Sequence, residues 1–307
     1  MKARIYKSTG SWYMAKAETG KMYNARIKGV FKIGGLTSTN PIAVGDEVDM
    51  QIEDVLEESA MIDTICDRKN YVARVSPHNK HQHHIIAANL DQSLLFATLK
   101  DPKTSQGFID RFLISCEAYH IPAIIVFNKS DLYKQKELDH FAHLQKIYSN
   151  IGYQVMLCSV EKNKGVEEIA ALLEGKTTLL SGHSGVGKST FINAVFPSLE
   201  LRTQEVSGWS GKGMHTTTFA EMFDLPTSGA IIDTPGIREL GLVDISKQEL
   251  SHYFPEMRAQ MGNCHFNNCM HIEEPGCAVK QALEAGAIAA DRYVSYLNIL
   301  MTMDAAH

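Results

Sequence analysis

The order of three polar motifs is the feature that most constrains how this chain of 307 residues can fold. In chain order they are NKSD at residues 128–131, GHSGVGKS at residues 182–189 and DTPG at residues 233–236. Each motif directly follows a short apolar run, which is typical of a buried parallel strand. Open parallel sheets bind ligands at the carboxyl ends of their strands, so all three motifs are expected at one edge of a single α/β sheet.

Residues 182–189 match the GxxxxGK[ST] pattern of a phosphate-binding loop. A β-forming run precedes them, and an amphipathic helix follows until Pro197 ends it. The glycines let backbone N–H groups converge on phosphate oxygens, and the helix N-terminus adds partial positive charge. We expect Lys188 at the β and γ phosphates and Ser189 on Mg²⁺, whereas the alternative is a glycine turn without a ligand. The residues expected around the phosphates are Gly182, His183, Ser184, Gly185, Val186, Gly187, Lys188, Ser189 and Thr190.

The NKSD motif predicts which base is bound. The carboxylate of Asp131 can accept from both N1–H and the N2 amine of guanine, and adenine lacks both donors on that edge. A buried acceptor left unpaired disfavours the wrong ligand by about 10⁴-fold, so the motif favours GTP over ATP. Asn128 and Lys129 complete the motif. Ser159 and Val160 end a later predicted strand, where their backbone N–H groups could approach guanine O6.

The DTPG motif and the segment before it are expected to meet the metal and the γ-phosphate. Asp233 would hold Mg²⁺ through water, and the Gly236 N–H would meet the γ-phosphate. Residues 212–218 contain three threonines, Thr217 among them, whose hydroxyls could bind Mg²⁺ in a first switch. Threonines before a strand are also common β-formers, so which of the three binds the metal is left open.

A hydrogen-bonding side chain is missing at the position where many GTPases orient the attacking water. Ile237 occupies that position, and isoleucine cannot hydrogen-bond water. We therefore expect slow turnover by the isolated chain and acceleration by a partner, since supplied transition-state groups contribute about 10³- to 10⁵-fold in rate. His215 is the nearest candidate catalytic substitute, with a solvated loop histidine as the alternative.

The motif order is permuted relative to an ordinary GTPase, in which the phosphate loop opens the domain and the base-reading motif closes it. The ends of the domain are therefore expected at a different edge of the same fold. The elements expected around the motifs alternate between strands at 90–99, 123–127 and 153–158 and helices at 107–120, 134–151 and 166–173. This alternation predicts a doubly wound, mostly parallel sheet.

Three of the six cysteines lie with a histidine in one short segment. The segment reads C-x4-C-x-H-x5-C and places four soft ligands within 14 residues: Cys264, Cys269, His271 and Cys277. Tetrahedral Zn²⁺ takes such a set, and four protein ligands favour a structural site over a catalytic one. His265 is a rival fourth ligand. Residues 278–303 are rich in Ala, Leu, Ile and Tyr, which predicts helices around the metal loop.

The motif order, the three threonines after a glycine-rich basic segment and the cysteine cluster resemble the RsgA (YjeQ or YloQ) family of circularly permuted GTPases. The resemblance covers nearly the whole chain. It implies a GTPase that converts GTP to GDP, binds the small ribosomal subunit and its rRNA, and acts late in the assembly of that subunit. It also implies an N-terminal OB-fold, a C-terminal zinc domain, and His271 rather than His265 as the zinc ligand. The chain departs from the family at Met214, where a basic residue is common.

The N-terminal segment is expected to form a small β-barrel. Strands are predicted at residues 4–17, 21–32, 43–53 and 59–67. Residues 1–32 carry eight Lys or Arg and one acidic residue, whereas residues 34–67 carry nine acidic residues and no basic one. Five aromatic residues lie among the basic ones, as in an OB-type RNA-binding face, although some must be in the core: Tyr6, Trp12, Tyr13, Tyr23 and Phe31.

Length and a hydrophobic content of 44% favour several domains. We expect an OB-fold RNA-binding domain at residues 1–69, a histidine-rich linker at 70–84, the GTPase domain at 85–243 and a zinc-binding helical domain at 244–307. No apolar run approaches the ~20 residues that span a bilayer, so we expect a cytoplasmic monomer that does not contact membranes. The net charge of −5 argues against a globally basic nucleic-acid binder, so contacts with RNA must be local.

Two other functions stay open on the sequence alone. The chain could be a GTPase that acts on translating ribosomes, or an RNA-binding scaffold whose nucleotide domain binds GTP without hydrolysing it. Turnover separates the scaffold from both enzymes. A preference for isolated small subunits over assembled ribosomes separates an assembly factor from a translation factor.

Overall fold

The computed structural model describes residues 1–10, 12–27, 41–75, 83–199, 220–234, 242 and 245–304. Six strands form a central sheet, in the spatial order β10 (Gln154–Leu157), β9 (Ala123–Phe127), β8 (Gln92–Ala97), β11 (Thr177–Ser181), β13 (Ala230–Asp233) and β12 (Glu221–Asp224). The first five strands are parallel, and β12 is antiparallel to β13. Two 3-10 helices follow β9 and the phosphate-loop helix, namely η1 (Ser130–Leu132) and η2 (Pro197–Leu199).

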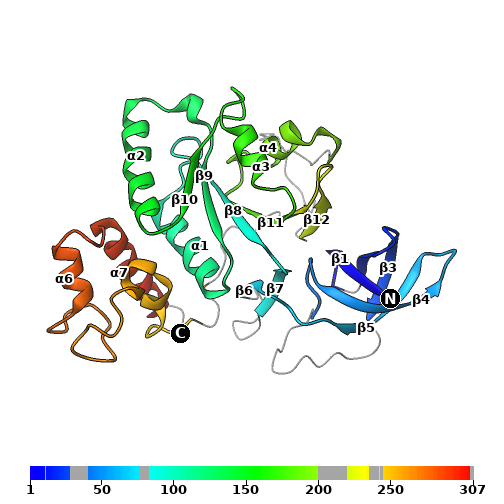
Figure 1. The fold of residues 1–307 in the computed structure, drawn as a ribbon, viewed down its shortest axis with the longest axis horizontal. Helices are drawn as coiled ribbons and strands as arrows, with labels where there is room; N and C mark the ends of the chain where they lie inside the picture. The colour runs from blue at the N-terminus through cyan, green and yellow to red at the C-terminus, as the bar shows by residue number, and fades with distance from the viewer. Residues whose placement is uncertain are drawn as a thin grey trace, which may run out of the picture.

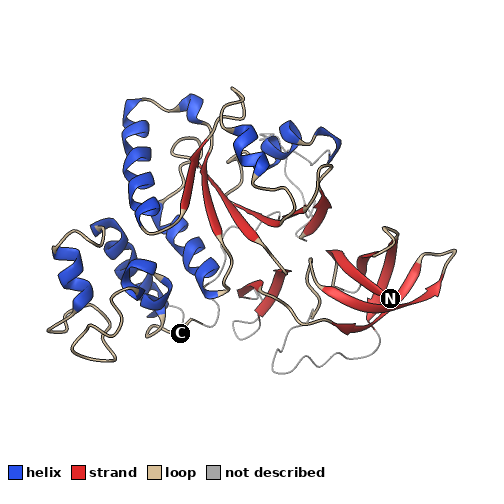
Figure 2. Ribbon diagram, viewed as in Figure 1, coloured by secondary structure: helices blue, strands red, loops and turns tan. Residues whose placement is uncertain are grey.

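Helices cover both faces of this sheet (Figure 2). On one face lie α1 (Gln106–Ala118) and α2 (Gln135–Asn150), and on the other α3 (Val166–Ala171) and α4 (Lys188–Val195). Successive residues of a strand point to opposite faces, and β8 follows this rule. Leu95 packs in the core with α1 and α2, whereas Phe96 packs in the core with α3 and α4. The expected doubly wound, mostly parallel sheet is therefore confirmed.

The N-terminal strands close into a barrel. In spatial order they are β1 (Lys2–Ser8), β2 (Tyr13–Ala17), β3 (Met22–Ile27), β5 (Ser59–Ile65) and β4 (Glu47–Asp54). β4 pairs back onto β1 and so closes the ring. Inward-facing side chains fill it, among them Ile5, Ala15 and Val48. The barrel expected at the N-terminus is confirmed.

The single strand expected at residues 4–17 is wrong, because the chain reverses direction within it. β1 and β2 form a hairpin in which Ser8 is paired with Tyr13. Gly10 lies in the turn with φ +91°, a conformation that favours glycine. The β-forming residues on both sides of this short turn make one continuous strand-like pattern, which hides the reversal.

The segment expected as a linker at residues 70–84 also contains regular structure. β6 (Tyr71–Val75) and β7 (His83–Ala88) pair in an antiparallel sheet of two strands. Val72 and Ala87 are buried in the same core as α1 and α2, which explains why this segment is ordered against the central domain. Histidines 83 and 84 are thus strand residues, while His78 and His81 lie outside the described residues.

The C-terminal unit is helical. Its elements are η3 (Leu250–Tyr253), α5 (Pro255–Arg258), α6 (Ala278–Glu284) and α7 (Ala290–Asp304). The helices predicted at residues 278–303 are present as α6 and α7. The core of this unit includes Phe254 and Tyr296, whose rings meet edge to face at 5.5 Å, and also Ile114 of α1. Helix α1 therefore belongs to the packing of two units.

The barrel and the C-terminal helical unit lie on either side of the central domain (Figure 1). The barrel joins the central sheet directly, because Lys7 of β1 pairs with Glu221 of β12. This pairing makes one sheet that continues from β10 into the barrel. Among the residues described above, no helix has the length and apolar character needed to cross a membrane.

Candidate nucleotide site and metal cluster

The phosphate loop lies between the end of β11 and the start of α4, as its sequence predicts. Gly182 has φ +134°, and a Cβ there would lie 2.3 Å from the carbonyl oxygen of Phe96. Gly187 precedes α4 with φ +97°, and a Cβ there would lie 2.4 Å from Nδ2 of Asn128. Both positions therefore need glycine for conformation and for space. The backbone of the loop packs closely against β8 and against the NKSD motif.

Lys188 and Asp233 are two half-buried charged groups, one at the end of this loop and one on the neighbouring strand. Nζ of Lys188 donates to the carbonyl oxygens of Gly182 at 2.7 Å and His183 at 3.1 Å. Burial lowers the pKa of the Lys188 ammonium, and the charge of Asp233 opposes that change. Burial also raises the pKa of the Asp233 carboxyl, and Lys188 opposes it. Each group thus favours the charged form of the other in a site that water reaches poorly.

One oxygen of Asp233 fits the Mg²⁺ role expected for it. Its Oδ1 is buried without a hydrogen-bond partner among the described residues. A buried carboxylate oxygen left in this way is suited to a hydrated cation, since Mg²⁺ takes oxygen ligands and keeps several waters. Ser189, the other expected ligand, lies in the first turn of α4 and is partly exposed. When bound, Mg²⁺ would neutralise phosphate charge.

The NKSD motif is tied to the phosphate loop and to the end of β10. Nδ2 of Asn128 donates to the Val186 carbonyl at 2.9 Å, and its Oδ1 accepts from the Val160 N–H at 3.3 Å. Oγ of Ser159 donates to Oδ1 of Asp131 at 2.5 Å. Two motifs that are distant in the sequence are thereby held together, with Ser159 and Val160 beside them.

Lys129 contacts the loop that contains Asp101, which has no recognisable sequence motif. It has φ +62°, and its Nζ donates to the Asp101 carbonyl at 2.6 Å. The hydroxyl of Tyr133 donates to the Asn128 carbonyl at 2.7 Å and so helps to hold the backbone of the motif in place. Sequence patterns could not reveal either contact, because each depends on one side chain that donates to one backbone carbonyl.

Several residues expected in the site lie outside the described part of the chain. They are His215 and Thr217 of the expected first switch, Gly236 of the DTPG motif, and Ile237 after it. Their expected roles stay predictions.

The three cysteines and the histidine of the C-x4-C-x-H-x5-C segment come together in space. The ligand atoms of Cys264, Cys269, His271 and Cys277 all lie within 4.8 Å of one another. Nδ1 of His271 is 3.4 Å from Sγ of Cys277 and 3.7 Å from Sγ of Cys264. Three thiolates and one imidazole nitrogen in this arrangement suit a tetrahedral metal site. The cluster can therefore hold a metal ion.

The metal loop is held by side chains that are not ligands. The carboxylate of Glu274 accepts from the N–H groups of Met270 at 2.7 Å and Ile272 at 2.8 Å. The hydroxyl of Tyr293, on α7, donates to the His271 carbonyl at 2.6 Å, which fixes a residue with φ +60°. The rival ligand His265 is not part of the cluster, and its ring meets Phe266 edge to face at 4.7 Å.

The aromatic residues expected on an RNA-binding face of the barrel have different positions. Tyr13 and Tyr23 are buried in the barrel core, and Trp12 is 52% exposed. Tyr6 is half-buried and donates to Oδ1 of Asp224 at 2.5 Å. Phe31 lies outside the described residues. Of the four described members of this set, Trp12 is the most exposed.

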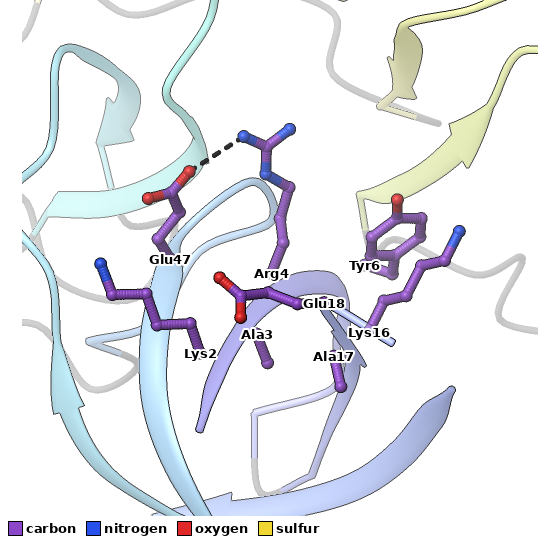
Figure 3. A pocket seen from close by; sticks show the side chains of 8 residues that line it. All are labelled: Lys2, Ala3, Arg4, Tyr6, Lys16, Ala17, Glu18 and Glu47. Atoms are coloured by element: carbon purple, nitrogen blue, oxygen red, sulfur yellow. Dashed lines mark hydrogen bonds and ion pairs between the residues drawn. The ribbon is translucent and has the colours of Figure 1, made fainter. Parts of the chain in front are cut away.

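A cavity of about 290 Å³ opens on the barrel surface beside β12 (Figure 3). Basic and acidic side chains line it together, namely Lys2, Arg4, Lys16, Glu18 and Glu47, with Tyr6 at one side. Arg4 is paired with Glu47 at 3.0 Å, and Lys16 is paired with Asp224 of β12. Two of the three cations that line the cavity are thus paired within the protein.

Comparison with known proteins places the chain in a family. A model of the RsgA GTPase matches residues 65–243, more than half of the chain, and a model of the RsgA N-terminal domain matches residues 2–60. The chain belongs to the RsgA GTPase family. Members of this family are GTP hydrolases.

Similar proteins cover nearly the whole chain. A small ribosomal subunit biogenesis GTPase RsgA of Cytophaga hutchinsonii is 55% identical over 304 residues, which are 99% of each chain. One of Bacteroides fragilis is 49% identical over 98% of this chain and 96% of its own. The crystal structure of YjeQ from Thermotoga maritima matches with a TM-score of 0.78 and 32% identity over 98% of this chain and 97% of its own. YloQ, a circularly permuted GTPase, matches with a TM-score of 0.74 and 30% identity over 100% of this chain and 96% of its own. The permuted fold is therefore confirmed.

Proposed function

We propose that this GTPase binds the small ribosomal subunit and acts late in its assembly, with a low intrinsic rate of GTP hydrolysis that the subunit increases. One observation carries the nucleotide part of this proposal: the Asn128 amide donates to the Val186 carbonyl at 2.9 Å and so joins the base motif to the phosphate loop. Relatives named small ribosomal subunit biogenesis GTPase are 49% to 55% identical over nearly the full length, which supports the subunit as partner.

The nucleotide site is assigned as follows. Asp131 reads guanine with Asn128 and Lys129, and the 182–189 loop with Thr190 binds the phosphates. Lys188 stabilises charge on the β and γ phosphates, and Ser189 and Asp233 hold Mg²⁺. The remaining proposed contacts are those of Ser159 and Val160 with the base, Gly236 with the γ-phosphate, Thr217 with the metal and His215 with the attacking water.

The flanking domains are assigned to RNA binding and to structural zinc. We place an OB-fold domain at residues 1–69, the GTPase domain at 85–243 and a zinc domain at 244–307, with 70–84 as the connection that contains β6. Zn²⁺ is the metal that fits three thiolates and one imidazole in a closed site. The exposed ring of Trp12, in an N-terminal segment rich in Lys and Arg, supports rRNA binding by the barrel. We propose that the chain works as a monomer in the cytoplasm, where small subunits are assembled.

The nucleotide state is proposed to set the orientation of the two flanking domains. β12 begins where the expected first switch ends, and β13, its neighbour, leads into the DTPG motif. The barrel is attached to β12 through Tyr6 and Lys16 on Asp224 and through Lys7 on Glu221 at 2.9 Å. β12 therefore lies in the sequence between the expected first switch and the DTPG motif, and it is bonded to the barrel. This position supports such coupling.

Hydrolysis with different partners tests the proposed function. GTP and ATP hydrolysis should be measured with the chain alone, with small subunits, with large subunits and with whole ribosomes. We expect guanine-specific turnover that is slow alone and increases most with isolated small subunits, by up to about 10³- to 10⁵-fold. Greatest stimulation by whole ribosomes would favour a translation GTPase, and no turnover in any arm would favour a binding scaffold. Equal rates in all four arms would contradict the proposal.

A further inference from the structure

Helix α1 contacts the phosphate loop with its first turn. The Phe108 ring stacks on the His183 ring, with centroids 3.8 Å apart and planes at 29°. Ser105 caps α1 by accepting from the Phe108 N–H at 3.2 Å, which holds Phe108 in an ordered turn. The carbonyl of His183 is one of the two acceptors of Lys188 Nζ. The stack therefore fixes the residue whose backbone holds the phosphate-binding lysine.

The same helix is anchored in the C-terminal unit by a buried ion pair. Oδ1 of Asp110 lies 2.6 Å from Nη1 of Arg292, and both side chains are at most 1% exposed. Arg292 also donates to Oε1 of Glu256 at 2.7 Å, and the Tyr148 hydroxyl donates to Asp110 at 2.7 Å. Separating such a pair leaves an uncompensated buried charge, so the contact resists opening.

Further contacts hold the rest of α1 to this unit. Glu117 pairs with Arg258 at 2.8 Å, and Ile114 is buried in the C-terminal core. Phe108 and Asp110 are only two residues apart, which is about 3 Å along a helix axis. If the C-terminal unit moves and takes Asp110 of α1 with it, Phe108 must therefore move as well.

We propose that Phe108 is a positioning residue for the phosphate loop, acting through His183, and that α1 thereby couples nucleotide affinity to the docking of the C-terminal unit. This inference rests on the proposed function, because it requires that residues 182–189 bind phosphates. It adds a second connection between the nucleotide and the metal-binding unit, independent of the DTPG motif. The connection runs from His183 to Phe108, along α1 to Asp110, and on to Arg292.

A double-mutant cycle on the full chain tests the first step, with the dissociation constants of GDP and a GTP analogue as readout. Phe108→Ala should weaken nucleotide binding by about 2- to 10-fold, since that is the range of a stacked aromatic pair. Phe108→Tyr keeps the ring and should restore wild-type affinity. His183→Ala should weaken binding similarly, and the double variant should be no weaker than the weaker single one. Leu138→Ala removes an exposed apolar side chain from α2 and is the control, with unchanged affinity expected.

The second step is tested by changing the remote anchor. Arg292→Gln should weaken nucleotide binding in the wild-type background and have no further effect in the Phe108→Ala background. Circular dichroism and metal content show whether this variant folds. If it does not, Arg111→Ala takes its place, because it removes only an exposed bond of 2.7 Å from α1 to Thr302 of α7.

Three results would overturn the inference. They are unchanged affinity in Phe108→Ala, additive effects of the Phe108 and His183 changes, and unchanged affinity in a folded anchor variant. Each leaves the proposed function intact. Absence of guanine-nucleotide binding by the wild-type chain would instead contradict the proposed function, and the inference with it.

Discussion

Asp131 is the residue on which guanine specificity is proposed to depend. Its carboxylate is held by the Ser159 hydroxyl at 2.5 Å, so it is already oriented before a base arrives. In Asp131→Asn, one acceptor becomes an N–H donor, which faces the donors of guanine but matches the C2 carbonyl of xanthine. We expect GTP binding to weaken by about 10- to 10³-fold and xanthosine triphosphate to bind in its place.

Competition titrations with GTP, xanthosine triphosphate and ATP measure this exchange. Asp139→Asn, which changes an exposed carboxylate on α2, is the matched control and should keep the preference for GTP. A variant at Asp131 that still prefers GTP would show that the base is read elsewhere.

The metal cluster gives a second prediction at the level of single residues. Cys277 is buried, supplies one of the four ligand atoms, and also accepts from the Lys280 N–H at the start of α6. Cys277→Ala leaves three ligands, so zinc content should fall from about one ion per chain to well below one, and the C-terminal unit should melt at lower temperature. Cys66→Ala, outside the cluster, should keep the metal. Retention of one Zn²⁺ by Cys277→Ala with unchanged folding would contradict the assignment.

β12 is the element that connects the barrel to the nucleotide site. Burial raises the pKa of Tyr6, and its hydrogen bond to Asp224 adds to that effect, so the phenol stays a donor at neutral pH. Asp224→Asn weakens the attachment of Tyr6 and Lys16. Because these groups are partly exposed, the loss in folding stability should be small, about 0–1 kcal/mol. The increase in GTP hydrolysis caused by the small subunit should nevertheless fall, while the rate of the isolated chain stays the same.

The ratio of stimulated to basal hydrolysis measures this effect. Glu53→Gln is the control, because it removes an exposed pair with Arg26 elsewhere on the barrel and should keep the full ratio. An unchanged ratio in Asp224→Asn would mean that β12 does not carry the signal.

Some elements could be predicted from the sequence because a local pattern specifies them. Short apolar or β-forming runs identified β9, β11 and β13, and glycine spacing identified the loop before α4. β12 escaped notice because it is an antiparallel strand of only four residues. β6 and β7 escaped notice because histidines and Pro77 give their surroundings the composition of a linker. In these two strands, side-chain burial against the central domain decides the conformation rather than composition.

The site could be predicted as far as its motifs extend. The contacts that join the motifs to the rest of the protein have no local signature. Asp110 and Arg292 are 182 residues apart, and the stack of Phe108 on His183 joins a helix to a glycine loop. Neither pairing changes the periodicity of its segment, so only the folded chain reveals it.

In the molecule as a whole, the permuted order gives the nucleotide site two different neighbours. The barrel is bonded to β12, and the C-terminal unit is bonded to α1. The two units lie on either side of the central domain (Figure 1). A change at the γ-phosphate can therefore reach each unit through its own element, and the distance between the two units should depend on which nucleotide is bound.

That distance tests the proposed coupling most directly. Probes can be attached through unnatural amino acids at Leu56 on the barrel and Met301 on α7, which are 93% and 66% exposed. The distance distribution would be measured on the small subunit with a GTP analogue and with GDP. We predict two distinct distributions, and a smaller difference between them in Asp224→Asn. Identical distributions for the two nucleotides would contradict the coupling.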